Sequence, residues 1–554
     1  MKHNILKKAA VFSLAMPMLA GCGETAQETA KEPESEMVST AAATEEAQVQ
    51  VDAGTLIGLK TGDLYSFRGI PYATAERFKS PEPVTEYENG YQLAFSWGPV
   101  SPQARTLSAS ASPNPYELLT PGNGTADLVG NENCQNLNVW TSDLSSQKPV
   151  IVFFHGGGLT SGSSGELSYY TGEYIAQSED VVFVSVNHRL NVLGFLDLSA
   201  YGEEYRNSGI AGLEDCVEAL RWVNRNIHAF GGDPDNVTII GQSGGGDKVT
   251  TLACMPETEN LFDKAVVMSG YYSDIPQAAG MAETAEMIEK LGLSEDEAAQ
   301  ALTEMPYEEL LAASAGMTFD YARVGTGSFT KPFLDENGKM NEYAAKRTWI
   351  IGSTYSEFND NSNIKIYGRQ DGYYIDEISD AEVIERLEAM YGENGQAIYD
   401  AYSDAYPLHK KAEALFLNTI GANLWSRNWM IEPENGGLKQ INDNGVTVYS
   451  YVSAYKQPFF GGAVQFHTSD IPYMFNSADE VPYLIAGDEE HAHAMAHWMS
   501  SALASFAEAG NPSTDELEWR PYTAEDHATM VFDYESECCA DHDAKIYDLI
   551  RSAQ

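Results

Sequence analysis

Val237-Thr238-Ile239-Ile240-Gly241-Gln242-Ser243-Gly244-Gly245 is the stretch of this sequence that decides its fold. An apolar run with β propensity leads into a Gly-x-Ser-x-Gly pattern, and the residues from Asp247 to Leu252 can form a helix. This order of strand, turn and helix presents a serine hydroxyl at the tip of a sharp turn. Glycines suit the flanking positions because side chains there would collide. The pattern predicts that Ser243 is a nucleophile, although it could arise by chance in a chain with 47 glycines.

A second glycine cluster, His155-Gly156-Gly157-Gly158, directly follows the apolar run from Pro149 to Phe154. Consecutive glycines let backbone N–H groups approach a developing negative charge, and one such donor lowers a reaction barrier by roughly 3–4 kcal/mol. Together the two clusters predict an oxyanion hole formed by the N–H groups of Gly157, Gly158 and Gly244. The alternative, which suits either cluster alone, is a flexible turn after a buried strand.

With these clusters the chain resembles the type-B carboxylesterases of the α/β-hydrolase superfamily, the group that includes para-nitrobenzyl esterases and cholinesterases. The resemblance runs from about Val51 to the C-terminus. Further matching blocks are Phe67–Ala73, Glu132–Val139, Asn187–Leu190, Gly212–Asp215, Phe230–Pro234, Gly510–Pro512 and Trp519. The resemblance implies an α/β fold with a mostly parallel central sheet flanked by helices, and helical insertions that wall an active-site gorge.

The resemblance also implies which residues act with Ser243 in catalysis. The family's catalytic histidine begins a block that reads here His467-Thr468-Ser469-Asp470-Ile471-Pro472-Tyr473-Met474-Phe475, so His467 is the expected base. The family's acid is usually a glutamate just after a strand that ends in Ile-Gly. Glu357 fits that position, and Asp360 is its nearest competitor. The order Ser, acid, His is that of α/β-hydrolases. The expected reaction is ester hydrolysis through an acyl-enzyme, without a metal or organic cofactor.

Three positions depart from the family pattern. Gln242 stands where the family usually has glutamate, which removes a negative charge beside the acyl site and weakens the case for a cationic substrate. Gly244 stands where alanine is usual, and its N–H can still donate. Ser101 stands where the family has the cysteine that pairs with the equivalent of Cys134. Cys134 is therefore expected to be a free, buried thiol.

Secondary structure is indicated by alternating apolar runs and helical segments. Buried strands are expected at Val150–Phe154, Val181–Val186 and Val237–Ile240, with a helix over Glu214–Ile227. The segments Met281–Ala315 and Ala381–Leu415 read as helix-rich and acidic, and the resemblance assigns them to the walls of the gorge. Leu159 is a candidate wall residue, and a core role is about as plausible. The blocks from Phe67 to Trp519 favour one large domain, expected at residues 51–554.

The N-terminus carries a separate signal. Lys2, Lys7 and Lys8 precede an apolar core too short to span a bilayer, and Leu19-Ala20-Gly21-Cys22 resembles a bacterial lipoprotein signal. Residues 1–21 would be removed, and Cys22 would carry acyl chains that anchor the protein to a membrane. Residues 22–50 read as a disordered tether. The expected location is extracytoplasmic, at the cell surface or in the periplasm. The alternative is an ordinary secretory signal with an incidental cysteine.

The net charge limits the molecules and surfaces that the protein can bind. The net charge of −48 disfavours nucleic acid and anionic membrane surfaces. A lipid on Cys22 is therefore the only membrane contact expected, and a small ester is the expected substrate.

No disulfide is expected among the remaining five cysteines. His493 and His497 could share a metal on a helix, but a solvated helix start is the favoured interpretation.

Two other functions stay open at this stage. One is a non-catalytic adhesion or binding protein on the same fold, which typically lacks the nucleophile. The other is an amidase or peptidase that uses the same triad.

Overall fold

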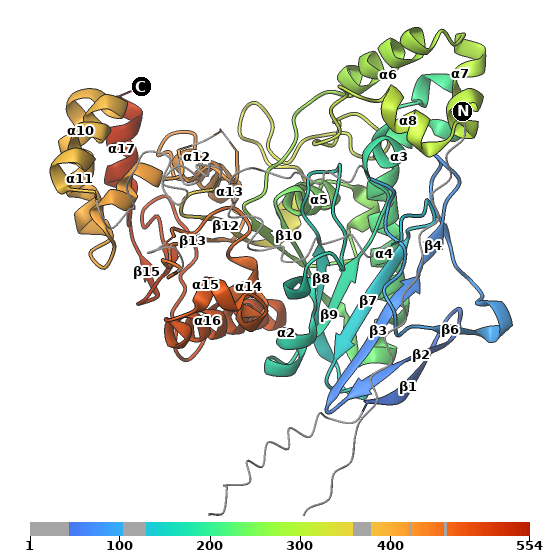
Figure 1. The fold of residues 1–554 in the computed structure, drawn as a ribbon, viewed down its shortest axis with the longest axis horizontal. Helices are drawn as coiled ribbons and strands as arrows, with labels where there is room; N and C mark the ends of the chain where they lie inside the picture. Colours follow the sequence, from blue (N-terminus) through green and yellow to red (C-terminus); the bar gives the residue numbers. More distant parts are fainter. Residues whose placement is uncertain are drawn as a thin grey trace, which may run out of the picture. The chain divides into compact units, whose positions relative to one another are not determined.

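The computed structural model of the chain describes residues 44–103, 129–357, 378–419, 421, 423–458 and 463–553. Among these residues, thirteen strands form one sheet (Figure 1). In sheet order they are β1 (Thr44–Val51), β2 (Gly54–Thr61), β3 (Leu64–Pro71), β7 (Asn136–Thr141), β9 (Val182–Val186), β8 (Lys148–Phe154), β10 (Gly232–Gln242), β11 (Lys264–Met268), β12 (Thr348–Thr354), β13 (Val448–Ser453), β14 (Thr529–Phe532) and β15 (Glu537–Cys539), with β6 (Tyr91–Leu93) paired to β2. A separate pair joins β4 (Ala73–Thr74) and β5 (Glu82–Pro83).

The centre of the sheet is parallel. Strands β9, β8, β10, β11, β12, β13 and β14 each run parallel to the next. Antiparallel pairs occur towards the edges, from β1 to β9 on one side and at β15 on the other. Because parallel strands end at the same edge of a sheet, the loops after β8, β10, β11 and β12 are gathered there.

The two faces of the sheet carry separate cores, because successive side chains of a strand point to opposite faces. On one face, residues such as Val152 and Ile239 belong to the same apolar cluster as α4 (Ala211–Asn226) and α5 (Gly244–Ala253). On the other face, Phe153 and Ile240 belong to a cluster with α2 (Glu173–Ser178), α14 (Ile471–Met474) and α16 (Glu489–Ala509). Burial on both faces explains why these strands read as continuous apolar runs.

Helical insertions follow two of the central strands (Figure 1). After β11 come α6 (Gln277–Leu291), α7 (Glu295–Glu304) and α8 (Tyr307–Ala313). After β12 come α10 (Asp380–Tyr391), α11 (Gly395–Ala405) and the 3-10 helix η11 (Lys411–Phe416), and α11 packs against α17 (Ala544–Ser552). Both helix-rich segments expected from the sequence are confirmed. The helix expected over Glu214–Ile227 begins three residues earlier, at Ala211.

The expected start of the folded domain at residue 51 is corrected by β1. This strand begins at Thr44 and pairs with β2 along all eight of its residues. Ala47, Val49 and Val51 are buried, while the residues between them face solvent. The outward polar residues dominate the composition of this edge strand, so the segment reads as a tether. The expected signal segment, Cys22 and the rest of the tether lie outside the described residues.

Within the described ranges, no helix combines the length and the apolar character needed to cross a bilayer.

Candidate active site

Ser243 occupies the turn between β10 and α5 in a backbone conformation that few non-glycine residues adopt. Its φ is +58° and its ψ is −125°. The N–H of Ser243 donates to the carbonyl of Met268 at 2.9 Å, which fixes the turn against the end of β11. A Cβ atom on Gly241 would lie 2.1 Å from the carbonyl oxygen of Gly245, so only glycine fits there. Such strain at a serine is typical of a nucleophile presented at a strand-to-helix turn.

The glycine loop after β8 lies directly against this turn. Gly157 and Gly158 have φ values of +87° and +64°, which glycine adopts without steric cost. A Cβ atom on Gly244 would lie 2.3 Å from the carbonyl oxygen of Gly158 and 2.4 Å from its Cα. The backbones of Gly158 and Gly244 are therefore in contact, and the alanine usual after the nucleophile would not fit here. Gly244 is the first residue of α5, so its N–H has no partner within the helix.

His467 and Glu357 form a buried pair. Nδ1 of His467 bonds to Oε2 of Glu357, and both residues are almost fully buried. Glu357 follows β12 with a φ of +45°, a strained conformation that turns its carboxylate inward. Its other oxygen, Oε1, accepts a hydrogen bond from the N–H of Thr354 at 2.7 Å. These bonds hold the carboxylate and the imidazole in one orientation. Asp360, the competing acid, lies outside the described residues.

Ser269 is a member of this site that the sequence reasoning missed. Its hydroxyl donates to Oε1 of Glu357 at 2.5 Å. Ser269 directly follows β11, between the strands that lead to Ser243 and to Glu357, and its φ is +47°. Its position after the neighbouring strand of a parallel sheet is the signal that could have found it.

Gln242 contacts the opposite side of the imidazole. Its side-chain nitrogen lies 3.3 Å from Nε2 of His467. Because Nδ1 faces a carboxylate, which only accepts, the proton of the neutral ring sits on Nδ1 and Nε2 carries the lone pair. The amide of Gln242 therefore donates to Nε2. The residue next to Ser243 thus touches the ring atom that would take up a proton, and a carboxylate at position 242 could not donate in this way.

The block that follows His467 is buried and supports it. Ile471, Pro472 and Tyr473 lie in the core at the start of α14. Asp470 is fully buried and accepts a hydrogen bond from the hydroxyl of Tyr451 at 3.0 Å. Burial, together with the nearby charge of Glu357, raises the pKa of Asp470 to about 7. The site therefore holds a second buried carboxyl group, which keeps its proton to a higher pH than an ordinary aspartate does.

A buried lysine lies behind the glycine loop. Lys248, in α5, donates from Nζ to the carbonyl of His155 at 2.7 Å, and burial lowers its pKa to about 8. The ring of His155 stacks on that of His188, with centroids 5.1 Å apart. Burial lowers the pKa of both histidines well below the ordinary value, so both are neutral at pH 7. Lys248 thus ties α5, the helix that follows Ser243, to His155 at the start of the glycine loop. Leu159, the candidate wall residue, is fully buried.

The expected free thiol at Cys134 is confirmed. Cys134 is buried and free, and burial raises the pKa of its thiol well above the usual range. The Ser101 hydroxyl lies beside it and also accepts a hydrogen bond from the N–H of Leu190 at 3.0 Å. The four other cysteines within the described part of the chain, Cys216, Cys254, Cys538 and Cys539, are free as well.

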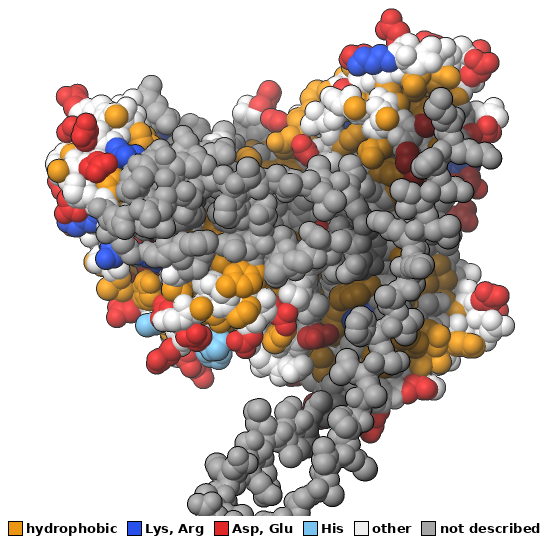
Figure 2. All heavy atoms as spheres, viewed as in Figure 1, with side chains coloured by type: hydrophobic (Ala, Val, Ile, Leu, Met, Phe, Trp, Pro, Cys, Tyr) orange, Lys and Arg blue, Asp and Glu red, His pale blue; other side chains and the backbone are white. Residues whose placement is uncertain are grey.

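The histidines of α16 bind neighbouring carboxylates. His491 bonds to Asp488, and Nε2 of His493 bonds to Asp479 at 2.8 Å. Figure 2 shows histidine side chains beside acidic ones on this surface. In the described portion of the chain, no group of three or more His, Cys, Asp or Glu side chains is placed to hold a metal ion.

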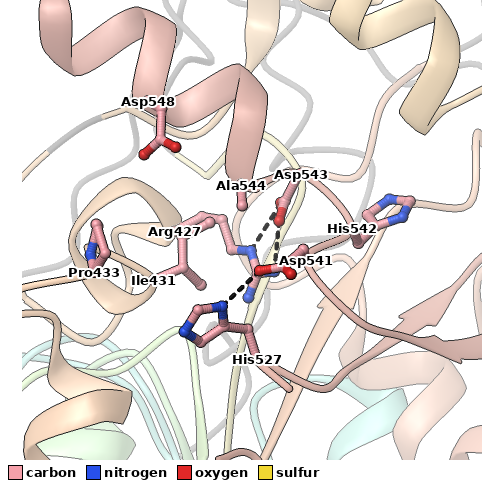
Figure 3. A pocket seen from close by; sticks show the side chains of 9 residues that line it. All are labelled: Arg427, Ile431, Pro433, His527, Asp541, His542, Asp543, Ala544 and Asp548. Carbon is pink, nitrogen blue, oxygen red and sulfur yellow. Dashed lines mark hydrogen bonds and ion pairs between the residues drawn. The ribbon is translucent and has the colours of Figure 1, made fainter. Parts of the chain in front are cut away.

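A separate pocket lies next to the start of α17 (Figure 3). Its centre is occupied by Arg427, whose Nε and Nη2 donate to the two carboxylate oxygens of Asp543 at 2.8 and 2.7 Å. His527 bonds to Asp541 at 2.5 Å on the same wall. The lining residues are Arg427, Ile431, Pro433, His527, Asp541, His542, Asp543, Ala544 and Asp548, so the pocket does not include the residues of the candidate active site.

A serine at a strand-to-helix turn, beside an imidazole–carboxylate pair and a glycine loop on a mostly parallel sheet, defines the α/β-hydrolase class. A model of the Carboxylesterase family matches residues 45–547, and the chain belongs to this family. The resemblance read from the sequence is thereby confirmed.

Relatives with known activities cover nearly the whole chain. Para-nitrobenzyl esterase of Bacillus subtilis is 28% identical over 88% of this chain and 95% of its own length. Phenmedipham hydrolase of Pseudarthrobacter oxydans is 28% identical over 86% of this chain and 93% of its own. A Clostridium hathewayi esterase that can hydrolyse aliphatic aromatic polyesters superposes with a TM-score of 0.79 at 33% identity, covering 92% of this chain and 100% of its own.

A Geobacillus stearothermophilus carboxylesterase superposes with a TM-score of 0.69 at 28% identity, covering 91% of this chain and 99% of its own. These neighbours confirm the α/β-hydrolase fold. The chain is a carboxylic ester hydrolase.

Proposed function

We propose that Ser243, His467 and Glu357 are the catalytic triad of this esterase, and that the N–H groups of Gly157, Gly158 and Gly244 form its oxyanion hole. The observation that carries the proposal is the placement of His467. Its Nδ1 is bonded to the carboxylate of Glu357, and its Nε2 is in contact with the residue next to Ser243. A neutral imidazole held in this tautomer is the base that a serine hydroxyl needs.

The reaction follows from these positions. His467 takes the proton of Ser243 as the hydroxyl oxygen attacks the ester carbonyl, and Glu357 stabilises the imidazolium. The tetrahedral oxyanion accepts hydrogen bonds from the three glycine N–H groups. His467 then protonates the departing alkoxide. A water molecule, deprotonated by His467, releases the acid from the acyl-enzyme.

The substrates proposed are small carboxylic esters. The named activities of the relatives involve a nitrobenzyl ester, phenmedipham and aliphatic aromatic polyesters. Such varied compounds support a site that recognises the ester carbonyl more than one particular alcohol. Short-chain nitrophenyl esters are therefore suitable first substrates, and the matching anilides test amide cleavage by the same residues.

Replacing the nucleophile tests the triad. Ser243→Ala should lower kcat by several powers of ten with little effect on folding, because the hydroxyl that forms the acyl-enzyme is removed. The measurement is the hydrolysis of a nitrophenyl ester by the variant and the wild type. Ser269→Ala, which removes a hydroxyl from the same site but not the nucleophile, is the matched control and should lose much less activity.

A fluorophosphonate label supplies an independent readout. Mass spectrometry of the labelled wild type should find the adduct on the peptide that contains Ser243, and Ser243→Ala should take up none. Equal turnover by the two proteins, or an adduct on another serine, would overturn the assignment.

We further propose that the protein is a lipoprotein held outside the cytoplasm through Cys22. The support is the order of a basic segment, a short apolar segment and Leu19-Ala20-Gly21-Cys22 in the sequence. Cys22→Ser should move the esterase from the membrane fraction to the soluble fraction of the cells that express it. Membrane association that persists in this variant would overturn the anchor.

A further inference from the structure

The carboxylate of Asp320 lies against the glycine loop. A Cβ atom on Gly158 would lie 2.8 Å from Oδ1 of Asp320, while a Cβ atom on Gly244 would lie 2.3 Å from the carbonyl oxygen of Gly158. Gly158 therefore has Asp320 next to it in one direction and the residue after the nucleophile in the other. Asp320 is exposed and Gly158 is half-buried, so the carboxylate lies where the loop meets solvent.

Three contacts hold Asp320 in this place. The hydroxyl of Thr160, on the glycine loop, donates to Oδ1 of Asp320 at 2.8 Å. The hydroxyl of Tyr271 donates to the backbone carbonyl of Asp320. Two residues further on, the N–H of Ala322 donates at 3.3 Å to Oδ2 of Asp247, a buried residue of α5. The carboxylate is thus held by Thr160, next to the glycine loop, and the backbone that carries it is held by Tyr271 and by Asp247 of α5.

In the parts of the chain that the structure describes, no Lys, Arg or His nitrogen lies within ion-pair distance of the Asp320 carboxylate. The nearest cation along the chain, Arg323, instead donates to the carbonyl of Thr318 at 2.8 Å and lies 3.4 Å from Glu283. An unpaired charge acts on any charged group that binds nearby, most strongly at low ionic strength.

We propose that Asp320 is a specificity-determining residue that disfavours esters carrying a carboxylate near the scissile bond, an inference that rests on the proposed roles of Ser243 and the glycine loop. A neutral diester of a short dicarboxylic acid would bind without penalty. Hydrolysis breaks one acyl C–O bond, consumes one water and releases one alcohol and one proton. The remaining half ester is an anion, which Asp320 repels. The enzyme therefore cleaves such diesters once and releases the half ester as product.

The test compares diethyl succinate with monoethyl succinate as substrates for wild type, Asp320→Asn and Asp235→Asn. The amide introduced by Asp320→Asn keeps an oxygen that can accept from Thr160 and removes the charge. Asp235→Asn is the matched control, because Asp235 is exposed and lies near the start of β10, at the end of the strand opposite Ser243. The quantity measured is kcat/KM for each ester, from the acid released at constant pH.

In Asp320→Asn the ratio of kcat/KM for the half ester to that for the diester should rise about fivefold, the effect of one charge a few ångströms away in water. It should stay unchanged in Asp235→Asn, and in wild type it should rise with added salt. An unchanged ratio in Asp320→Asn, an equal rise in Asp235→Asn, or a wild type that cleaves both esters equally well overturns the inference. So does a wild type inactive on diethyl succinate, whereas activity retained by Ser243→Ala overturns the triad instead.

Discussion

At the scale of single residues, the site depends on backbone positions that exclude side chains. Gly244, which follows Ser243, illustrates this. An alanine at position 244 would place its Cβ atom inside van der Waals distance of Gly158. The nearest atoms belong to the backbone of Gly158, so no flexible side chain could move away. The loop and the turn would have to separate, and the N–H donors with them.

Gly244→Ala should therefore lower kcat about a hundredfold, comparable to the loss of one oxyanion donor. KM should change much less, because the ground-state ester does not need these donors as strongly. Steady-state kinetics with a nitrophenyl ester measures both. Gly130→Ala is the control, since a Cβ atom there meets its nearest neighbour at an ordinary 3.7 Å. A Gly244→Ala enzyme as active as wild type would show that the two backbones separate at no cost.

The buried carboxyl of Asp470 should make stability depend on pH. Its pKa is about 7 in the folded protein, mainly through burial, against about 3.9 in an unfolded chain. Between these values the folded state keeps a proton that the unfolded state has lost, so stability falls as pH rises through this window. Asp470→Asn should remove this negative contribution, so the slope of the unfolding free energy against pH should become more positive by up to about 1.4 kcal/mol per pH unit. Urea unfolding from pH 4 to 7 measures it, and Asp235→Asn should keep the wild-type slope.

At the scale of elements, a buried histidine joins η11 to the end of β14. Nδ1 of His409 bonds to Glu413 and Nε2 bonds to Asp533, each at 2.6 Å. Burial alone would lower the pKa of His409, but the two carboxylates outweigh it and raise the pKa to about 10. The stabilisation is therefore fully present below about pH 6.5 and is lost as pH rises through about 10.

Replacing this histidine should destabilise the protein. His409→Gln removes the cation that joins two buried carboxylates and leaves Glu413 with Lys456, whose Nζ lies 3.7 Å from Oε1. Breaking a buried ion pair typically costs about 3–5 kcal/mol. His491→Gln is the matched control, because His491 is exposed and bonds to a single aspartate. Urea unfolding at pH 7 should show a lower midpoint for His409→Gln and no change for His491→Gln. Equal midpoints for the two variants would mean that the buried cluster contributes nothing.

Strands and helices were predictable where their burial leaves an apolar pattern in the sequence. The central strands and the turn at Ser243 follow from apolar runs and glycines, and the family resemblance added His467 and Glu357 as candidates. The residues missed lie where distant segments meet. No motif in the local sequence marks Ser269, Lys248 or Asp320. Only the folded sheet brings them to the site. The edge strand β1 was missed because its outward residues are polar.

At the scale of the whole molecule, the net charge of −48 is the dominant property. Self-repulsion of this size destabilises the compact state, and salt screens it. The melting temperature should rise as NaCl increases from about 0.01 M to about 1 M, over which the Debye length falls from roughly 30 to 3 Å. Scanning calorimetry measures the shift. A melting temperature that falls or stays constant over this range would show that favourable ion pairs balance the repulsion.

The full-length pairing of β1 with β2 bears on how this enzyme is produced in the laboratory. An expression clone trimmed to begin at residue 51, as the composition alone would suggest, removes nearly the whole of this strand. One entire side of β2 would then offer unsatisfied N–H and C=O groups, and exposed sheet edges of that kind recruit other chains into aggregates. Clones that begin before Thr44 avoid this hazard.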